Sequence, residues 1–372
     1  MRLFDPLTFF KKTWLIVGTL ALSFSLMGSA SAETNSETTK DFQIQPNEIR
    51  YYETLSGTPE EEKEKGLLEH KEAIELVNQH MEKHNSLIET DFDNVDYQKY
   101  VISLAFAFDF NDEDMKKVVK FAKFMDWYEN YGKNEKIKDY EKKHSQRAQL
   151  STEEIIDLDG LLPIEDNAPT TVDDGLISTT SSTEEEIAST FAVSANGYNN
   201  IAARDYAYDW WNGRNPVYST YYAEYYGCKL SDGLSCWNKW NDCANFVSQA
   251  LYTGGMKFKY GASYASDESW HFGSLIPSYT WGGAHNFYKH WKTRAGVAST
   301  VSDLQTGDAV SLNTDTDSDI EHTVIITKNT GNSSANKYIT QHTWDHMEQR
   351  TLADMFSSGY GVYGYEIDKA TN

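Results

Sequence analysis

The chain has 372 residues and a mass of 42.4 kDa, which exceeds one domain of ordinary size, so we expect two domains. Its 33 basic and 56 acidic side chains give a net charge of −23, which argues against nucleic acid or an anionic membrane surface as a partner. Three cysteines are too few for a disulfide scaffold, whereas 40% hydrophobic and 14% aromatic residues are enough to build a core.

Residues 1–32 have the pattern of a secretory signal peptide. The apolar run Thr13–Gly28 is shorter than the roughly 20 residues that span a bilayer, and Ala30 and Ala32 form a small-residue cleavage site. An uncleaved anchor is the alternative. We expect cleavage, and therefore an exported mature chain with no stable membrane span.

Residues 33–165 are predicted to form an acidic, mainly helical domain. Hydrophobic residues recur at helical spacing within 60–89, and again from Met115 to Met125, after a cap at Asn111 or Asp112. The apolar stretch 100–110 fits either a strand or a buried helical turn. The expected apolar face of the first segment comprises Leu67, Leu68, Ile74, Val77, Met81 and Ile88.

The helical domain offers no recognisable chemistry. His80 and His84 share a helix face, but no carboxylate or thiol at a suitable spacing completes a metal shell, so we interpret them and His70 as solvated histidines. Residues 166–195 are rich in Ser and Thr and hold no Lys or Arg, which is typical of a flexible linker. An O-glycosylated stalk is the alternative for this linker.

The chemistry is expected in a second domain, residues 196–372. Asp242 is a natural N-cap for a helix that begins at Cys243 and ends at Gly254 and Gly255. The unpaired N–H groups and the dipole of such a helix lower a thiol pKa and stabilise an oxyanion, which favours Cys243 as a nucleophile. The alternative is a small buried cysteine that packs under the helix.

A thiol nucleophile needs a base, and two histidines lie on a predicted hairpin. His322 begins one alternating strand and His342 ends the next, with residues 330–336 as the turn, so both imidazoles lie at the open end. We predict that His322 takes the thiol proton and that His342 orients it, with Asp345 as the alternative third member. Surface hairpin histidines are the competing interpretation.

Four segments of this domain together resemble a known family. The segments, in chain order, are DCANFVSQALYTGG, SYTWGGAHNFYKHW, HTVIIT and YITQHTWD. They resemble the amidase domain of exported Firmicute proteins, a relative of the NlpC/P60 cysteine peptidases. The resemblance covers roughly residues 196–372. It implies an α+β, papain-like fold in which the helix bearing the cysteine packs on an antiparallel sheet.

The resemblance also implies Cys243 as nucleophile, His322 as base and His342 as the third polar residue. It points to an exported, cell-wall-associated protein of a Gram-positive bacterium, with peptidoglycan or a peptide as substrate. We therefore predict a thiol-dependent amidase or peptidase that needs no cofactor. An acyl transferase that uses the same residues and a non-catalytic wall-binding protein are the alternatives.

The remaining motifs give weaker expectations. Cys228 and Cys236 are placed to form a disulfide, with two unpaired thiols or a redox switch as the alternatives. Trp240, Trp270 and Trp281 are candidates for a groove on which sugar rings or peptides stack, although core packing explains most aromatic residues. His285 and His290 are assigned to the surface or to packing.

No metal site is expected. His342 and His346 are four residues apart, but they lie at a strand end rather than on a helix. Asp315, Asp317 and Asp319 have the spacing of a calcium loop. Counted from Asp315, however, the sixth residue is Ile320 instead of Gly and the twelfth is Ile326 instead of Glu, so we expect a polar loop.

Overall fold

The computed structural model describes residues 49–147, 150–165, 168–174, 193–218, 242–273, 277–315 and 317–372, all within one compact unit, Phe42–Asn372. The predicted signal peptide, the Cys228 and Cys236 pair and Trp240 lie outside these residues. Among the described helices none is long and apolar enough to cross a membrane.

The N-terminal region is helical, as predicted. The segment 60–89 forms two helices, α1 (Pro59–Glu69) and α2 (Lys71–Lys83), which meet at His70. A Cβ built at Gly66 would overlap the ring of Phe124, so the glycine lets α1 approach the long helix α4 (Asp112–Arg147) closely. The predicted apolar face is correct for Val77 and Met81 but wrong for Leu67 and Leu68, which are 45% and 81% exposed, because the break at His70 interrupts a single helical face.

The stretch 100–110 forms no strand, and its residues 100–106 are helical. Helix α3 (Val95–Ser103) continues into the 3₁₀ turn η2 (Leu104–Phe106), and these apolar residues are buried. The long helix α4 (Asp112–Arg147) confirms the second predicted helix, and the Asn111 side chain caps it by accepting from the N–H groups of Glu113 and Asp114. Helix α5 (Thr152–Leu161) follows.

The C-terminal part contains one antiparallel sheet of five strands, in the order β4, β3, β2, β1, β5. The strands are β1 (Ala309–Asn313), β2 (His322–Asn329), β3 (Lys337–Gln341), β4 (His346–Thr351) and β5 (Gly361–Tyr365). Strands β2 and β3 form the predicted hairpin, with Ile325 opposite Thr340. Single 3₁₀ turns and one short helix connect or flank the strands: η5 (Val301–Asp303), η6 (Ser334–Asn336), α12 (Leu352–Ser357) and η7 (Ile367–Lys369).

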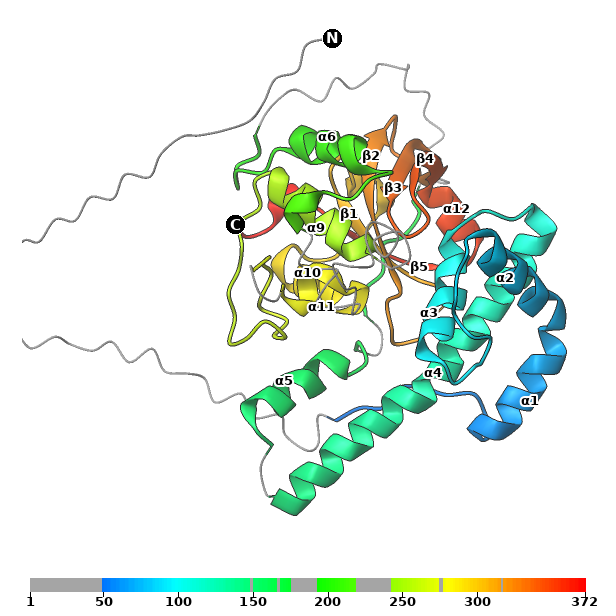
Figure 1. The fold of residues 1–372 in the computed structure, drawn as a ribbon. Helices are drawn as coiled ribbons and strands as arrows, with labels where there is room; N and C mark the ends of the chain where they lie inside the picture. Colours follow the sequence, from blue (N-terminus) through cyan, green and yellow to red (C-terminus); the bar gives the residue numbers. More distant parts are fainter. Residues whose placement is uncertain are drawn as a thin grey trace, which may run out of the picture. The chain divides into compact units, whose positions relative to one another are not determined.

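Helices cover both faces of this sheet (Figure 1). Alternate residues of β2 point to opposite faces. Ile325 packs with the helices of the C-terminal part, whereas Val324 and Ile326 pack with α2, α3 and α4 of the N-terminal region. The C-terminal helices are α6 (Asn200–Trp210), α9 (Cys243–Thr253), α10 (Tyr279–Gly282) and α11 (Ala284–Arg294), with the 3₁₀ turn η3 (Pro216–Tyr218) after α6.

The helical region and the sheet therefore share one hydrophobic core. Val101, Phe121 and Met125 from the helices are fully buried together with Val310 and Leu312 from β1. The composition of the sequence suggested one domain that ends at residue 165 and another that begins at residue 196. These two parts do not have separate hydrophobic cores. The structure does confirm the coarser expectation of a mixed α and β protein with a helical N-terminal region.

Part of the predicted linker is packed on the sheet. Thr171 donates its N–H to the carbonyl of Val362 in β5 (2.8 Å) and its hydroxyl accepts from Gly364 N–H (2.8 Å). Val172 forms an isolated bridge with Thr300. A flexible spacer is thus the wrong interpretation for residues 168–174. A polar sequence also suits a segment that forms hydrogen bonds with the backbone groups of an edge strand, here β5.

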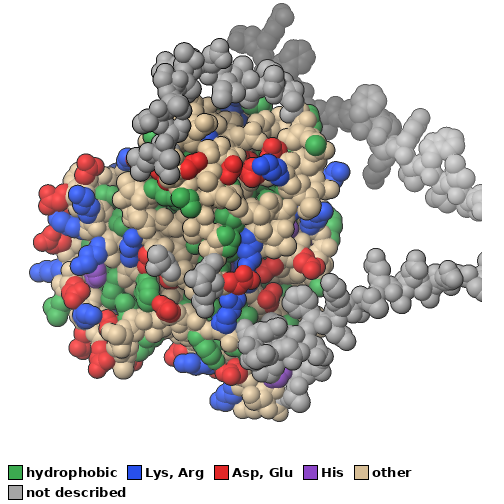
Figure 2. Space-filling view, turned by 180° about the vertical axis from the view of Figure 1, so that it is seen from behind, with side chains coloured by type: hydrophobic (Ala, Val, Ile, Leu, Met, Phe, Trp, Pro, Cys, Tyr) green, Lys and Arg blue, Asp and Glu red, His purple; other side chains and the backbone are tan. Residues whose placement is uncertain are grey.

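The acidity does not gather into one patch on the face drawn in Figure 2, where acidic and basic side chains are interspersed. The C-terminal 196–372 carries 13 basic and 18 acidic residues, a balance of 13 − 18 = −5. Charge alone therefore says little about a ligand of this part.

Candidate active site

Cys243 is the first residue of α9, as predicted, and it is buried, with 4% of its surface exposed. Burial and the neighbouring Asp242 charge raise the pKa of its thiol to about 12, although the N–H groups of Thr323, Ala244 and Cys243 itself pull it down. The expected lowered pKa is therefore wrong for this state. The helix N-terminus acts in the predicted direction, but the cost of burying a thiolate is larger.

His322 is the first residue of β2 and is also buried, with 2% exposed. Its Nε2 lies 3.2 Å from Oε1 of Gln341, and the Phe106 ring stacks on it with ring centroids 4.5 Å apart. Burial lowers the pKa of His322 to about 4, a shift that the Gln341 hydrogen bond opposes and His346 supports. The imidazole is thus neutral at pH 7.

Gln341 fixes which nitrogen of His322 carries the proton. The Gln341 amide nitrogen donates to the carbonyls of Phe106 (2.8 Å) and Trp344 (3.2 Å), so its Oε1 must be the atom that faces His322. An oxygen acceptor there requires N–H at His322 Nε2. The lone pair then lies on Nδ1, which is the tautomer of a base.

The Cys243 thiol and the His322 imidazole are not hydrogen-bonded to each other among the described contacts. Cys243 instead accepts from the N–H of Thr323, the residue directly after His322. Helix α9 packs against β2, which brings the two elements together. Long or missing contacts between catalytic groups are common without substrate. The start of α9, the start of β2 and the end of β3 thus carry a thiol, a neutral imidazole and the amide that is hydrogen-bonded to it.

His342 belongs to a different network from the one predicted. Its Nδ1 lies 3.0 Å from Asp242 Oδ2, its Nε2 lies 2.8 Å from the carbonyl oxygen of Trp210, and its ring stacks on Phe246 of α9. It does not orient His322. Consecutive residues after a strand point to opposite faces, so Gln341 faces His322 and the helical region while His342 faces α9.

Asp345 and Asp242 are held by Arg214. The guanidinium donates to both carboxylate oxygens of Asp345 at 2.9 Å, and its Nε lies 3.3 Å from Asp242 Oδ2. Asp242 occupies the N-cap position of α9, but its side chain makes no capping hydrogen bond. Neither carboxylate contacts His322, so the predicted cap and the alternative third member both serve the His342 network instead.

A turn of unusual backbone conformation joins the two networks. Thr343 and Trp344 have φ angles of 58° and 65°, which non-glycine residues adopt infrequently. Thr343 Oγ1 accepts from the N–H of Asp242 (3.0 Å), and the Trp344 carbonyl accepts from Gln341. The turn thus positions residues on both sides of the sheet end.

The predicted tryptophan groove is wrong for the two residues that are described. Trp270 and Trp281 are fully buried, and their indole N–H groups donate to Ser248 (3.0 Å) and Asn245 (2.8 Å) of α9. They support the helix that carries Cys243. His290 is likewise a packing residue, buried against Trp291 and donating to the Asp267 carbonyl.

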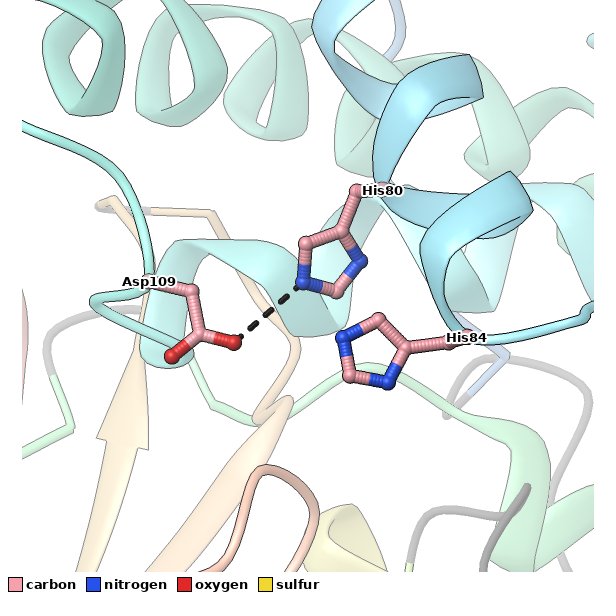
Figure 3. A group of neighbouring side chains, drawn as sticks. All are labelled: His80, His84 and Asp109. Atoms are coloured by element: carbon pink, nitrogen blue, oxygen red, sulfur yellow. Dashed lines mark hydrogen bonds and ion pairs between the residues drawn. The ribbon is translucent and has the colours of Figure 1, made fainter.

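The histidines of the helical region lie beside the sheet end. His80 Nε2 lies 3.3 Å from Asp109 and its Nδ1 lies 2.8 Å from the Tyr100 hydroxyl, with the exposed His84 stacked on its ring (Figure 3). His80, His84 and Asp109 are near enough to share a metal ion. Both nitrogens of His80 already have protein partners, so we interpret this group as a hydrogen-bonded cluster.

The zinc shell weighed for His342 and His346 does not form. His346 Nε2 donates to the Ala107 carbonyl (2.6 Å), while His342 faces α9. Neither histidine belongs to any potential metal group found among the described residues.

The comparisons bear on this half of the chain. Residues 197–365 match the model of the family described as "Putative amidase domain". The match confirms the resemblance to the amidase family over this range, and an amidase is a hydrolase of amide bonds. It contains Cys243, His322 and Gln341.

A curated relative adds no function. The "Uncharacterized protein YhbB" of Bacillus subtilis (strain 168) is 27% identical over 141 residues, which are 36% of this chain and 39% of that protein. The chain thus matches well under half of the length of this relative. No solved structure is significantly similar to the chain.

Proposed function

We propose that this protein is a thiol-dependent amidase in which Cys243 is the nucleophile, His322 the general base and Gln341 the residue that orients the base. The observation that carries the proposal is the Gln341 amide, whose two carbonyl contacts present Oε1 to His322 and leave Nδ1 as a proton acceptor. A nucleophile, a base and an orienting group are the three parts of a covalent hydrolase site. The amidase family match supports the same reaction class.

The reaction follows from these roles. Cys243 Sγ attacks the carbonyl carbon of an amide while its proton passes to His322 Nδ1, and the C–N bond breaks as that proton goes to the leaving amine. The product is a thioester with Cys243. Water then attacks the thioester, gives one proton to His322, and releases the carboxylic acid as the proton returns to sulfur.

The raised thiol pKa and lowered imidazole pKa have a mechanistic consequence. A thiolate and an imidazolium are both disfavoured in this buried site, so the resting pair is neutral. Proton transfer then accompanies attack instead of preceding it. The Cys243 thiol should accordingly react slowly with iodoacetamide at pH 7, because the thiolate is the reactive form.

The substrate class and the location are further parts of the proposal. We propose a papain-like, NlpC/P60-type site that cleaves peptide or amide bonds of peptidoglycan outside the cell, after removal of residues 1–32. Support comes from the α9 packing on an antiparallel sheet and from the signal-like sequence pattern. N-terminal sequencing of protein from the culture medium tests export, and a first residue at Glu33 is expected.

Two other functions remain as outcomes of the same experiment. An acyl transferase would pass the thioester to an amine in place of water. A non-catalytic wall-binding protein would retain Cys243 as a packing residue, and its burial is the observation in favour of that outcome.

The test is digestion of purified peptidoglycan by the full mature chain and by Cys243→Ala and His322→Ala, with mass spectrometry of the soluble products. New carboxyl and amine termini that both variants lose support hydrolysis, and new cross-links support transfer. Binding to the wall without product would leave the wall-binding function and reject the enzyme. Cys243→Ser serves as the matched variant, because it keeps the side-chain volume and should retain at most about one part in a thousand of the activity.

A further inference from the structure

A group of buried carboxylates joins the helical region to the strand that carries His322. Helix α4 contributes Asp126 and Glu129, and the segment between β1 and β2 contributes Asp317, Asp319 and Glu321. Asp126 is 0% exposed and Asp317 and Asp319 are 7% and 8% exposed. So much buried like charge needs compensation, because isolated carboxylates are costly to remove from water.

Part of this charge is neutralised within the protein. Lys133 of α4 forms ion pairs with Asp319 and with Glu129 (2.5 Å to the latter), and His285 Nδ1 lies 2.5 Å from Asp319. In agreement, Lys133 and His285 lower the pKa of Asp319 against the effect of burial. Asp319 and Glu129 are therefore partnered.

The other three carboxylates are held by neutral donors only among the described contacts. Asp126 accepts from the Thr314 hydroxyl (2.7 Å), Glu321 from the Thr314 N–H (2.6 Å), and Asp317 from the N–H of Asp319 (2.9 Å). Lys133 attracts Asp126 and Asp317 through space, but its ion pairs are formed with Glu129 and Asp319.

Two of their oxygens also accept no hydrogen bond. Asp126 Oδ1 and Glu321 Oε1 are buried without any hydrogen-bond partner. One ligand oxygen from each of Asp126, Asp317 and Glu321 lies within 4.8 Å of the other two. A buried acceptor without a donor destabilises the fold, more so when it is charged, so two such oxygens in one cluster point to a positive partner.

We propose that Asp126, Asp317 and Glu321 bind one divalent cation, calcium, between α4 and the segment that precedes β2. When all three carboxylates are ionised they supply −3, and Ca²⁺ then leaves −1 in a site that already has hydrogen-bond donors. Calcium accepts several carboxylate oxygens at 2.3–2.6 Å in flexible geometry, whereas Mg²⁺ prefers to retain water and zinc prefers nitrogen or sulfur.

The ligands explain why the calcium-loop pattern failed in the sequence. That pattern requires every ligand within twelve consecutive residues. Here Asp126 comes from a helix, 317 − 126 = 191 positions before Asp317. The missing glycine at Ile320 and the missing glutamate at Ile326 therefore do not argue against this cation.

Such a cation would connect the helical region to the candidate active site. Glu321 directly precedes His322, and Asp126 lies on the same helix as Lys133, which pairs with Asp319. Binding would hold the start of β2 against α4. We expect calcium to stabilise the folded chain, an effect that is measurable whether or not the amidase proposal holds.

The test begins with the full mature chain stripped of metal by a chelator that is then removed. Calcium at about one hundred times its dissociation constant should raise the thermal midpoint by about 5 °C for a chain of this size, because a ligand that binds only the folded state stabilises it. Tb³⁺ should bind in place of calcium and show luminescence excited through Trp127, whose indole N–H donates to Asp315 in the same segment. Excess calcium should abolish that luminescence.

Variants locate the site. Asp126→Asn and Glu321→Gln should each lose the calcium-dependent shift and the terbium signal, whereas Glu135→Gln, an exposed residue on the same helix, should keep both. The wild-type measurements decide even if a variant fails to fold. The absence of a shift and of terbium luminescence in the wild type, an equal shift in Asp126→Asn, or a shift with Mg²⁺ alone would each overturn the calcium site.

Discussion

Two histidines at one end of the sheet lie 20 positions apart in the chain and have opposite surroundings. His322 faces the helical region, where Phe106 and Gln341 surround a neutral ring, and among the described residues its side chain is hydrogen-bonded to an amide alone. His342 faces α9, where Asp242 and Arg214 surround it with charge. The first environment suits a residue that must accept and release a proton, and the second suits one that holds a helix in place.

The comparison assigns different parts of the chain to the two tasks. The His322 side depends on η2, since the Phe106 carbonyl orients Gln341 and the Phe106 ring covers the imidazole. The His342 side depends on the segment after α6, through Arg214. The helical region, which showed no chemistry of its own, thus completes the proposed base.

Substitution of Gln341 and of His342, followed by measurement of amide hydrolysis, tests whether the two histidines have separate tasks. Gln341→Ala should reduce kcat by about 10²- to 10⁴-fold, because the imidazole loses its tautomer and its orientation. His342→Ala should leave kcat within about tenfold in protein that is still folded. The pH profile of kcat should change only in the Gln341 variant.

Equal losses of activity in Gln341→Ala and His342→Ala would mean that the two histidines do not have separate tasks. Gln341→Glu is the matched variant for orientation. It keeps an oxygen acceptor near His322 but replaces the amide that donates to the Phe106 and Trp344 carbonyls, so partial activity is expected.

The second test addresses the structural task of the His342 network. Arg214→Ala leaves Asp242 and Asp345 buried or partly buried without their guanidinium, and loss of one partner of a buried pair costs about 3–5 kcal/mol. Urea unfolding should show this loss in the free energy of unfolding. The exposed pair of Arg204 with Asp205 supplies the control, since Arg204→Ala should cost under about 1 kcal/mol.

The sequence predicted the parts of the site that depend on local patterns. The start of α9 at Cys243, the His322 strand and the β2–β3 hairpin follow from capping residues, alternation and a turn. Gln341 was missed in favour of the adjacent His342, because a shift of one residue in strand register exchanges the two faces, and the register depends on packing and on the irregularity between Ile326 and Lys328.

The contributions from distant segments had no local signal. Phe106 belongs to the apolar stretch 100–110, and Asp126 belongs to helix α4. Their neighbours in space lie about 200 positions later in the chain, so the periodicity of the sequence could not identify these contacts. The prediction of a lowered pKa for the Cys243 thiol was wrong for a related reason. A helix terminus is visible in sequence, but the depth of its burial is not.

The smallest expected effect is the contribution of His322 to the pH dependence of the free energy of unfolding. In the folded chain the pKa of His322 is lowered to about 4, against about 6.5 for an ordinary histidine, so between these values the unfolded chain binds more protons. Stability therefore rises with pH through this window and is lost on acidification. From pH 7 to pH 5, His322 alone should cost about 2 kcal/mol of unfolding free energy.

Urea unfolding of the wild type and of His322→Gln at both pH values, in excess chelator, measures this contribution. The loss on acidification should be about 2 kcal/mol smaller in the variant, because glutamine does not titrate. Buried His290, whose pKa is lowered to about 3, and the carboxylates between α4 and β2 also titrate, but they are common to both proteins and cancel in the difference. An equal loss in the two proteins would show that His322 is solvated in solution, and the distinction between a buried neutral base and a histidine held among charged side chains would then fail.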